Sequence, residues 1–336
     1  MTCCPWTMAG LTAVWVLGLA VYGGFLGLLF AGVDRVLVAR MQGRIGPPVA
    51  QPFADVRKLL HKQDTMPETA VGPVFRFAPV LALAGALTVL LYVPLGGLEH
   101  AGLLAGRGDA LLVLYLLLLP GLGMVLGGFA SGSPYASLGA QREMVSMMSY
   151  EFPLATTVLA FAWRLADAGV EAPFSLWTMA AHPVWAETGP IGWAGAALLL
   201  GVMLLVLPGE MGRIPFDAPE AETELAGGLL VEYSGRNLAL FELAQAIKSV
   251  ALCGLMTALF LPWRPSDAWG MAWPWAVVAN LAAFALKAGL WMFLGVSLVR
   301  AAVARLRVTD IVRVYWKWLG GASLAGLLLL MVDAAL

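Results

Sequence analysis

The stretch GEMGRIPFDAPEAETELAGGLLVEYSGRNLALFELAQA, residues 209–246, lies between two strongly apolar segments but is itself rich in acids. Against two cations, Arg213 and Arg236, it holds a third of the acidic residues of the chain: Glu210, Asp217, Glu220, Glu222, Glu224, Glu232 and Glu242. Carboxylates within a membrane are costly and more often line an ion or proton path than a lipid face. Two glycines and two prolines prevent a continuous helix in its first part. Irregular backbone at that depth needs protein or water around it, so the stretch predicts a site or the approach to one.

The composition is that of a membrane protein. Hydrophobic residues make up 60% of the 336 residues, charged residues 12%, and the mean hydropathy is +0.83. A soluble fold of this length could not bury so much apolar surface. The formal net charge of −1 says little, because membrane orientation depends on where Lys and Arg lie and not on their total.

Apolar runs long enough to cross the hydrocarbon core of a bilayer recur along the chain. We therefore expect an all-α polytopic membrane protein, a single integral membrane domain over residues 1–336, with eight transmembrane helices. The fourth is the weakest of these predictions, because Glu143, Glu151 and Pro153 interrupt its apolar run. The expected spans are residues 10–33, 77–97, 109–131, 145–164, 191–208, 238–262, 272–297 and 317–335.

The placement of the cations predicts the orientation. Fifteen of the twenty Lys and Arg residues fall in four loops, 34–76, 132–144, 209–237 and 298–317. The positive-inside rule assigns these loops to the cytoplasm. Both termini are then expected on the outer side of the cytoplasmic (inner) membrane. The acidic loop, defined here as residues 209–237, is expected on its cytoplasmic side.

The first basic loop contains an amphipathic segment. In residues 52–63, Phe53, Val56, Leu59 and Leu60 share one arc, with Asp55, Lys58 and Lys62 opposite. Such a pattern predicts a short helix lying in the membrane surface on the cytoplasmic face. Arg40 and Arg44 lie beside the turn before it, and this loop is equally consistent with a basic lipid-surface helix and with a further role. The last basic loop, 298–317, is equally consistent with anchoring by its cations and with docking of a soluble partner.

Polar residues also occur inside the expected spans. Glu143 and Tyr150 share a helical face, and Glu151 lies one step round from it. Glu242, Gln245 and Lys248 form a polar seam, and Lys287 lies well inside the seventh span. These acids and lysines can pair across helices as structural contacts, or they can relay protons, because buried ionisable groups shift their pKa readily. Both interpretations stay open at this point.

Redox centres and other common sites are not predicted in this chain. Its three cysteines, Cys3, Cys4 and Cys253, have no CxxC spacing and no nearby histidine partners, whereas an iron–sulfur cluster or a structural zinc generally needs four ligands. We therefore expect no cofactor and no metal here. The sequence shows no phosphate-binding loop, no nucleophile with a base and no nucleic-acid signature.

Three motifs together carry a family resemblance. They are GRIGPPVAQPFADVRKLLHK at 43–62, MMSYE at 147–151, and GRIPFDAPEAETELAGGLLVEYSG at 212–235 followed by ALFELA at 239–244. The chain resembles the H subunit of respiratory complex I (mitochondrial subunit 1), and also the equivalent subunit of energy-converting membrane-bound NiFe hydrogenases of the formate hydrogenlyase, Ech and carbon-monoxide-induced types. The short form GPPVAQPFAD at 46–55 and the APEAETEL run favour the hydrogenase branch, while MMSYE is also similar to complex I.

The resemblance implies a role and a set of residues. The chain would anchor a soluble arm made of the hydrogenase large subunit and the small iron–sulfur subunit, which would hold the NiFe centre and the iron–sulfur clusters. It would pass a proton signal to antiporter-like membrane subunits. Arg40, Arg44, Asp55, Lys58, Arg213 and Arg236 would dock the partners or tune carboxylates. The implied proton path is Asp217, Glu220, Glu222, Glu224, Glu232 and Glu151. To it we add Glu242 and Lys248 of the polar seam and Lys287 of the seventh span.

Other functions are weaker on the same residues. In complex I the region of the acidic loop bounds a quinone chamber, so a quinone-site subunit is the main alternative. A stand-alone ion transporter would be expected to show internal repeats with matched helix breaks, and none is seen. A purely structural anchor would tolerate Glu→Gln substitutions in the acidic loop.

Overall fold

The computed structural model describes residues 5–95, 110–272 and 274–336, without the side chains of residues 5–15, 222 and 223. These residues form helices and loops, with no β-strand among them. The long helices are α1 (Pro5–Met41), α3 (Gly72–Tyr92), α4 (Ala110–Ala130), α5 (Pro134–Asp167), α8 (Pro190–Glu210), α10 (Gly235–Phe260), α12 (Trp275–Trp291) and α15 (Gly320–Ala335). The all-α membrane fold predicted from composition is confirmed.

Seven helical segments in the described residues are long and apolar enough to cross a membrane. They correspond to seven of the eight expected spans, with α12 continuing through a π-helical segment, η3 (Met292–Ser297), into α13 (Leu298–Ala302). The last span joins α14 (Val308–Arg313) to α15 through a second π-helical segment, η4 (Val314–Leu319). The remaining expected span, 145–164, lies within α5, which runs unbroken past Pro153 and packs beside α4, α8 and α15.

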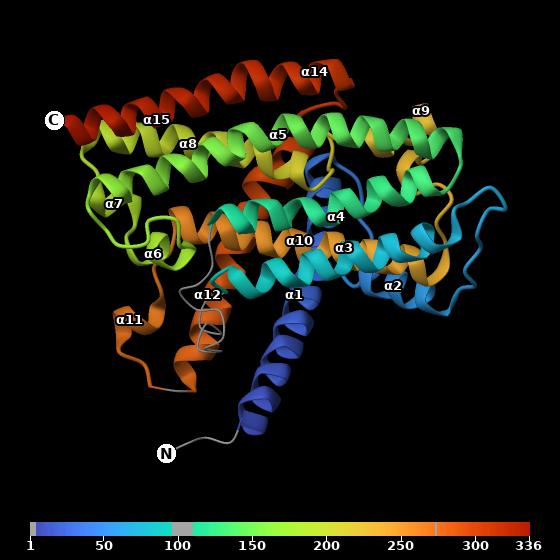
Figure 1. The fold of residues 1–336 in the computed structure, drawn as a ribbon, viewed down its shortest axis with the longest axis horizontal. Coiled ribbons are helices and arrows are strands. Elements are labelled where there is room, and N and C mark those ends of the chain that lie inside the picture. Colours follow the sequence, from blue (N-terminus) through green and yellow to red (C-terminus); the bar gives the residue numbers. More distant parts are fainter. Residues whose placement is uncertain (1–4, 96–109, 273) are drawn as a thin grey trace.

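Helix α10 forms the centre of the bundle (Figure 1). Within its apolar window 89% of the residues are buried, because the helix packs against α1, α3 and α12. Small residues allow close helix contacts elsewhere. A Cβ on Gly123 of α4, for example, would lie 2.9 Å from the Ala78 carbonyl oxygen of α3.

The four basic loops meet at one end of the bundle, which we call the loop end. The hydroxyl groups of Thr65 and Ser234 form a hydrogen bond of 2.7 Å between the first and third of these loops. Two ion pairs connect the acidic loop to the other two, Arg142 with Glu224 and Arg305 with Asp217. The short helices α2 (Gln51–His61) and α9 (Glu222–Leu225) lie at this end, while α6 (Leu176–Ala181), α7 (Val184–Glu187) and α11 (Pro265–Trp269) lie at the opposite end (Figure 1). The amphipathic helix expected at 52–63 is α2, with Val56 buried and Lys58 exposed.

An interhelix cap fixes the far end of α8. The Asp333 carboxylate of α15 accepts hydrogen bonds from the backbone N–H groups of Gly189 and Gly192, at 2.8 and 2.9 Å. The first N–H groups of a helix have no partner within the helix, so an acid from another helix stabilises the start of α8. This cap fixes the position of α8 along its axis against α15.

Candidate functional site

The acidic loop is irregular, as its glycines and prolines predict. Within the described backbone between α8 and α10 it makes only single turns: the 3-10 turns η1 (Ala218–Glu220) and η2 (Gly228–Leu230), and α9. Several of its residues are nevertheless buried, including Phe216, Asp217 and Leu229. The loop is therefore folded into the end of the bundle.

Two arginines from other loops hold the acidic loop in place. Arg305 lies 2.8 Å from Asp217, and Arg142 of α5 lies 2.5 Å from Glu224. Arg142 also donates a hydrogen bond to the Ala218 carbonyl oxygen, and Leu306 N–H donates to the Pro215 carbonyl oxygen at 3.0 Å. The acids of this loop are thus held by cations that the sequence places in different basic loops.

A cleft of about 610 Å³ opens where these elements meet. Its walls come from α5, the acidic loop and the segment before α14, and they combine Asp217 and Glu224 with Arg142, Arg305 and Arg307. Asp217 is 7% exposed. Its burial raises the pKa of the carboxyl above its ordinary value, and the Arg305 guanidinium offsets part of that rise. The cleft therefore has a carboxyl group at its base whose protonation depends on the neighbouring arginine.

A buried ion pair lies inward of the cleft. Lys248 Nζ, in the middle of α10, is 2.9 Å from Glu210 Oε1 at the end of α8, and the two side chains are only 2% and 1% exposed. Apart from this ion-pair contact, neither carboxylate oxygen of Glu210 has a hydrogen-bond partner among the described residues. A charged pair buried in an apolar bundle is costly, and such groups typically mark a functional path.

Further ionisable side chains surround this pair. Glu143 of α5 is buried, and the charges of Lys248, Glu220 and Glu210 act on it. Glu151 lies on an adjoining face of the same helix and interacts electrostatically with Glu210 and Lys248. We call Glu143, Glu151, Glu210 and Lys248 the carboxylate–lysine cluster. Through Glu220 the cluster is electrostatically linked to the acidic loop.

Two tyrosines cover the cluster. Tyr150 of α5 and Tyr315 of η4 are fully buried, with ring centroids 6.1 Å apart in an edge-to-face contact. Tyr315 donates a hydrogen bond to the Leu205 carbonyl oxygen, and the hydroxyl end of its side chain lies against Gly209, beside Glu210. The Tyr150 hydroxyl has no hydrogen-bond partner in the described part of the chain. Bound water could satisfy this hydroxyl and the Glu210 oxygens.

The structure brings together some of the predicted proton-path residues and separates others. Asp217 and Glu224 line the cleft, Glu220 acts on Glu143, and Glu151 and Lys248 belong to the cluster. Glu232 is half-buried, Glu242 is exposed on α10, and the Glu222 side chain lies outside the described residues. The polar seam of α10 thus turns away from the cluster at Glu242.

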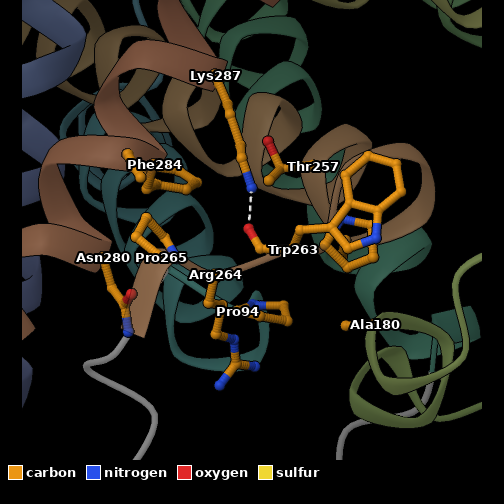
Figure 2. A pocket seen from close by; sticks show the side chains of 12 residues that line it. Pro94, Ala180, Thr257, Trp263, Arg264, Pro265, Asn280, Phe284 and Lys287 are labelled. Atoms are coloured by element: carbon orange, nitrogen blue, oxygen red, sulfur yellow. Dashed lines mark hydrogen bonds between the residues drawn. The ribbon is translucent and has the colours of Figure 1, made fainter. Parts of the chain in front are cut away.

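Lys287 lies in a different place. Its Nζ donates hydrogen bonds to the backbone carbonyl oxygens of Leu261 and Trp263, just beyond the end of α10. Figure 2 shows the side chain pointing to the Trp263 carbonyl, with Asn280 and Phe284 of the same helix beside it. Leu261 follows Lys248 by thirteen helical steps, which is roughly 20 Å at 1.5 Å per residue. In this structure Lys287 therefore caps the end of α10 and does not touch the cluster.

The predicted docking residues gather on the surface of the loop end. Arg40, Arg44, Lys58 and Arg236 are exposed, and Arg213 is half-buried. Asp55 of α2 accepts from Arg35 at 3.2 Å and from Gln51 at 2.9 Å, which ties α2 to the end of α1. Arg236 Nε lies 3.7 Å from Asp64.

Three buried acids are not among the residues of the implied proton path. Glu210 and Glu143 belong to the cluster, and Asp34 of α1 accepts hydrogen bonds from Ser297 and Arg300, each at 2.7 Å. A signal for Glu210 existed, because it ends an otherwise uncharged apolar run of 21 residues. Among the described residues, no three His, Cys, Asp or Glu side chains form a group that could hold a metal ion.

The fold and the buried charges define a polytopic membrane protein with an ionisable cluster beneath a charged cleft. Comparison with known proteins gives its family. A family model described as NADH dehydrogenase matches residues 14–331, and the chain belongs to this family, which includes the H subunit of NADH-quinone oxidoreductase. It is therefore a membrane subunit of the complex I-like type.

Relatives of two kinds are similar to this chain. The H subunit of NADH-quinone oxidoreductase from Anoxybacillus flavithermus is 37% identical over 311 residues, covering 87% of this chain and 85% of the relative. Hydrogenase-4 component C of Escherichia coli is 33% identical over 316 residues, covering 94% and 95%. A chain in the structure of the membrane-bound sulfane sulfur reductase, an archaeal respiratory membrane complex, has the same fold, with a TM-score of 0.80, 24% identity and coverage of 95% and 99%.

Proposed function

We propose that this chain is the membrane-anchor and proton-coupling subunit of a membrane-bound energy-converting NiFe hydrogenase complex. The observation that carries the coupling role is the Glu210–Lys248 pair, buried at 2.9 Å within electrostatic range of Glu143 and Glu151. A buried ion pair is a costly way to join two helices, and replacing such a pair by apolar residues is often neutral or stabilising, which supports a role in coupling over a purely structural contact.

The proposed mechanism starts at the cleft. Electron transfer in the soluble arm would change the charge or conformation near Asp217, Glu220 and Glu224. Because Glu220 acts on Glu143, that change would alter the proton affinity of the carboxylate–lysine cluster. A proton would then move between Glu143, Glu210 and Glu151, with Lys248 stabilising whichever carboxylate is charged.

The remaining predicted residues have other roles in this proposal. Glu242 is exposed on α10 and would meet a neighbouring subunit, and Lys287 would keep the end of α10 in place through its two carbonyl contacts. Glu222 and Glu232 would shape the charge of the acidic loop toward the soluble arm. None of these four is needed for transfer within the cluster.

The partners follow from the same arrangement. The hydrogenase large subunit and the small iron–sulfur subunit, which would hold the NiFe centre and the clusters, would dock over the basic loop 34–76 and the acidic loop. Arg40, Arg44 and Lys58, all exposed there, supply positive charge. Antiporter-like subunits would lie beside the bundle in the inner membrane. By the positive-inside rule the loop end faces the cytoplasm and both termini lie outside.

Two features support the hydrogenase assignment: the short sequence GPPVAQPFAD in the first loop, and the share of the relative's length that this chain matches. Hydrogenase-4 component C matches over 95% of its own length, against 85% for the relative from Anoxybacillus flavithermus. The second candidate is the H subunit of an NADH:quinone oxidoreductase, and the higher identity of 37% to that relative favours it. In that case the acidic loop would form part of the wall of a quinone chamber.

One experiment separates the two candidates. The complex is purified gently from its native membrane, its metals are measured and its subunits are identified. Nickel together with iron and hydrogen-linked turnover supports the hydrogenase proposal. Iron without nickel, with NADH oxidation that quinone-site inhibitors block, would replace it with the quinone-site assignment.

The coupling role is tested in the same complex with Glu210→Gln. We expect proton translocation per turnover to be largely lost. Glu171→Gln, the same chemical change at an exposed acid outside the cluster, should leave it intact. Unchanged translocation in Glu210→Gln would show that the buried pair is structural.

A further inference from the structure

Each of the last two membrane spans contains a π-helical segment, η3 in the first and η4 in the second. Because its hydrogen bonds join residues five apart, a π-helical turn holds an extra residue compared with an α-helical turn, and such turns are rare and frequently lie at functional sites. The chain between the two segments consists of α13, residues 303–307 and α14, and it carries Arg305. We call residues 292–319 the π-hairpin.

The π-hairpin contacts α8 on the turns just before Glu210. A Cβ at Gly295 of η3 would lie 3.0 Å from the Leu204 carbonyl oxygen, so glycine permits this close approach. Tyr315 of η4 donates a hydrogen bond of 3.1 Å to the Leu205 carbonyl oxygen. Both π-helical segments therefore hold the same end of α8, the end that carries the acid of the buried ion pair.

This end of α8 depends on support from outside the helix. Pro208 lies within it and has no N–H, so the Leu204 carbonyl oxygen lacks the donor that the fourth residue along gives in an α-helix. Gly209 follows, and glycine is a poor helix former. Glu210, the last residue of α8, therefore takes its position from the contacts of the π-hairpin as well as from its own helix.

The π-hairpin also holds the chain just after Glu210. Arg305 lies 2.8 Å from Asp217, and a backbone hydrogen bond from the next residue of the hairpin strengthens this contact. Tyr315 lies between the two contact regions, because its ring centroid is 4.9 Å from that of Phe216, the neighbour of Asp217. The side chain of Tyr315 thus links the ion pair at the base of the cleft to the end of α8.

The extra residue of η4 gives this link two possible states. If η4 converted to an α-helix while α15 stayed in place, the residues at its start would rotate by about 100°, the angle of one residue in an α-helix. That rotation would carry Tyr315 away from Leu205 and Phe216. The pair of Arg305 with Asp217 opposes it, because it ties the segment before α14 to the acidic loop.

We propose that η4 is a conformational switch controlled by the ion pair of Arg305 with Asp217. While the pair is made, η4 stays π-helical and Tyr315 holds the end of α8. When the pair is broken, η4 converts to an α-helix, Tyr315 leaves Leu205, and Glu210 is free to move. Tyr315 is thus a positioning residue for Glu210. The inference rests on the proposed function only in taking Glu210 as a coupling residue.

The test is hydrogen–deuterium exchange of the backbone amides in the intact complex, measured by mass spectrometry on peptides covering residues 204–211 and 311–319. Asp217→Asn removes the charge that holds Arg305, and the matched control Glu224→Gln removes the acid of the other ion pair of the acidic loop. Because conversion of η4 breaks backbone hydrogen bonds, we expect Asp217→Asn to speed exchange severalfold in both peptides. Glu224→Gln should leave both at the wild-type rate, and residues 190–200 of α8 should not change in either variant.

Two further variants separate the steps of the switch. Tyr315→Phe removes the hydrogen bond to Leu205 and should speed exchange in residues 204–211 but not in 311–319. Deletion of Trp318, which is 64% exposed, takes the extra residue out of η4 and leaves the converted state. In that background Asp217→Asn should no longer change the exchange of residues 204–211.

Three results would overturn the proposal: wild-type exchange of residues 311–319 in Asp217→Asn, faster exchange confined to the acidic loop, or an equal effect of Glu224→Gln. Exchange is measured without turnover, so it is separate from the assigned reaction. A purified complex without nickel would end the hydrogenase assignment and leave the switch intact, whereas wild-type exchange in Asp217→Asn would end the switch and leave that assignment intact.

Discussion

Removing the cation of the buried pair should destabilise the protein far more than removing the whole pair. In Lys248→Met, a side chain of similar length fills the space, but Glu210 keeps its position with 1% exposure and loses its counter-charge at 2.9 Å. At an effective dielectric constant of about 20, two unit charges at this separation attract by roughly 6 kcal/mol. Desolvation offsets part of this attraction, and breaking a buried pair typically costs about 3–5 kcal/mol.

The double variant Glu210→Gln/Lys248→Met provides the matched comparison. It removes both charges, and replacing a whole buried pair by neutral groups is often nearly neutral for stability. The two single variants and the double variant are compared by heating the purified complex and measuring, by size-exclusion chromatography, the temperature at which half of this subunit is lost. We expect Lys248→Met to be lowest and the double variant to recover most of the loss.

Two results would refute this reasoning. If Lys248→Met retained wild-type stability, Glu210 would have to carry no charge that needs a partner. If the double variant were as unstable as Lys248→Met, the lysine would act through packing of its apolar stem and not through its charge. Proton translocation in the double variant should stay low in either case, because the ionisable groups are gone.

Three further predictions concern the supports of the cluster. Gly209→Ala should lower the same thermal midpoint, because a Cβ at Gly209 would collide with the Tyr315 side chain. The control Gly201→Ala, on the same helix, has open space around it and should be neutral or slightly stabilising. Equal effects of the two substitutions would contradict the close contact at Gly209. Asp333→Leu should lower the free energy of unfolding by about 1–2 kcal/mol, because the Gly189 and Gly192 N–H groups lose their acceptor. Asp333→Asn should lower it less, because the amide keeps one acceptor oxygen. A Leu variant as stable as wild type would show that the cap is dispensable. Arg305→Ala should raise the pKa of Asp217 further above its ordinary value. A carboxyl whose pKa is raised in the folded state contributes most stability at low pH and loses it as pH rises through that raised pKa, so the thermal midpoint of Arg305→Ala should fall more steeply than wild type from about pH 4 upward, and Arg305→Ala/Asp217→Asn should remove the extra slope. A wild-type slope in Arg305→Ala would contradict this account.

The helices could be predicted because each depends on local sequence. Long apolar runs gave seven of the eight expected spans, and the arc of Phe53, Val56 and Leu59 predicted α2 to within two residues at each end. The irregular acidic loop followed from its prolines and glycines. In α5, by contrast, the acids and Pro153 interrupted the apolar pattern without interrupting the helix, since packing against α4, α8 and α15 supports its backbone.

The cluster could be predicted only in part, because it depends on which helix faces meet. Helix α8 is apolar on all sides, so its sequence does not fix its rotation about its own axis, and nothing local indicates that Glu210 turns toward α10. The pairing of Asp34 with Arg300 joins residues 266 positions apart. Periodicity places side chains on a face of their own helix, but it does not identify the partner.

The two lysines of the expected spans show why environment decides their roles. Both were predicted as members of one relay, and both lie on helices in the same bundle. Lys287 meets backbone carbonyls, which carry no proton to exchange, so its charge is held by fixed dipoles at the end of α10. Lys248 meets a carboxylate, with two more carboxylates close enough to act on the same site. Because the charge balance around Lys248 changes whenever one of those acids gains or loses a proton, coupling should centre on Lys248, and Lys287 should affect it only through the position of α10.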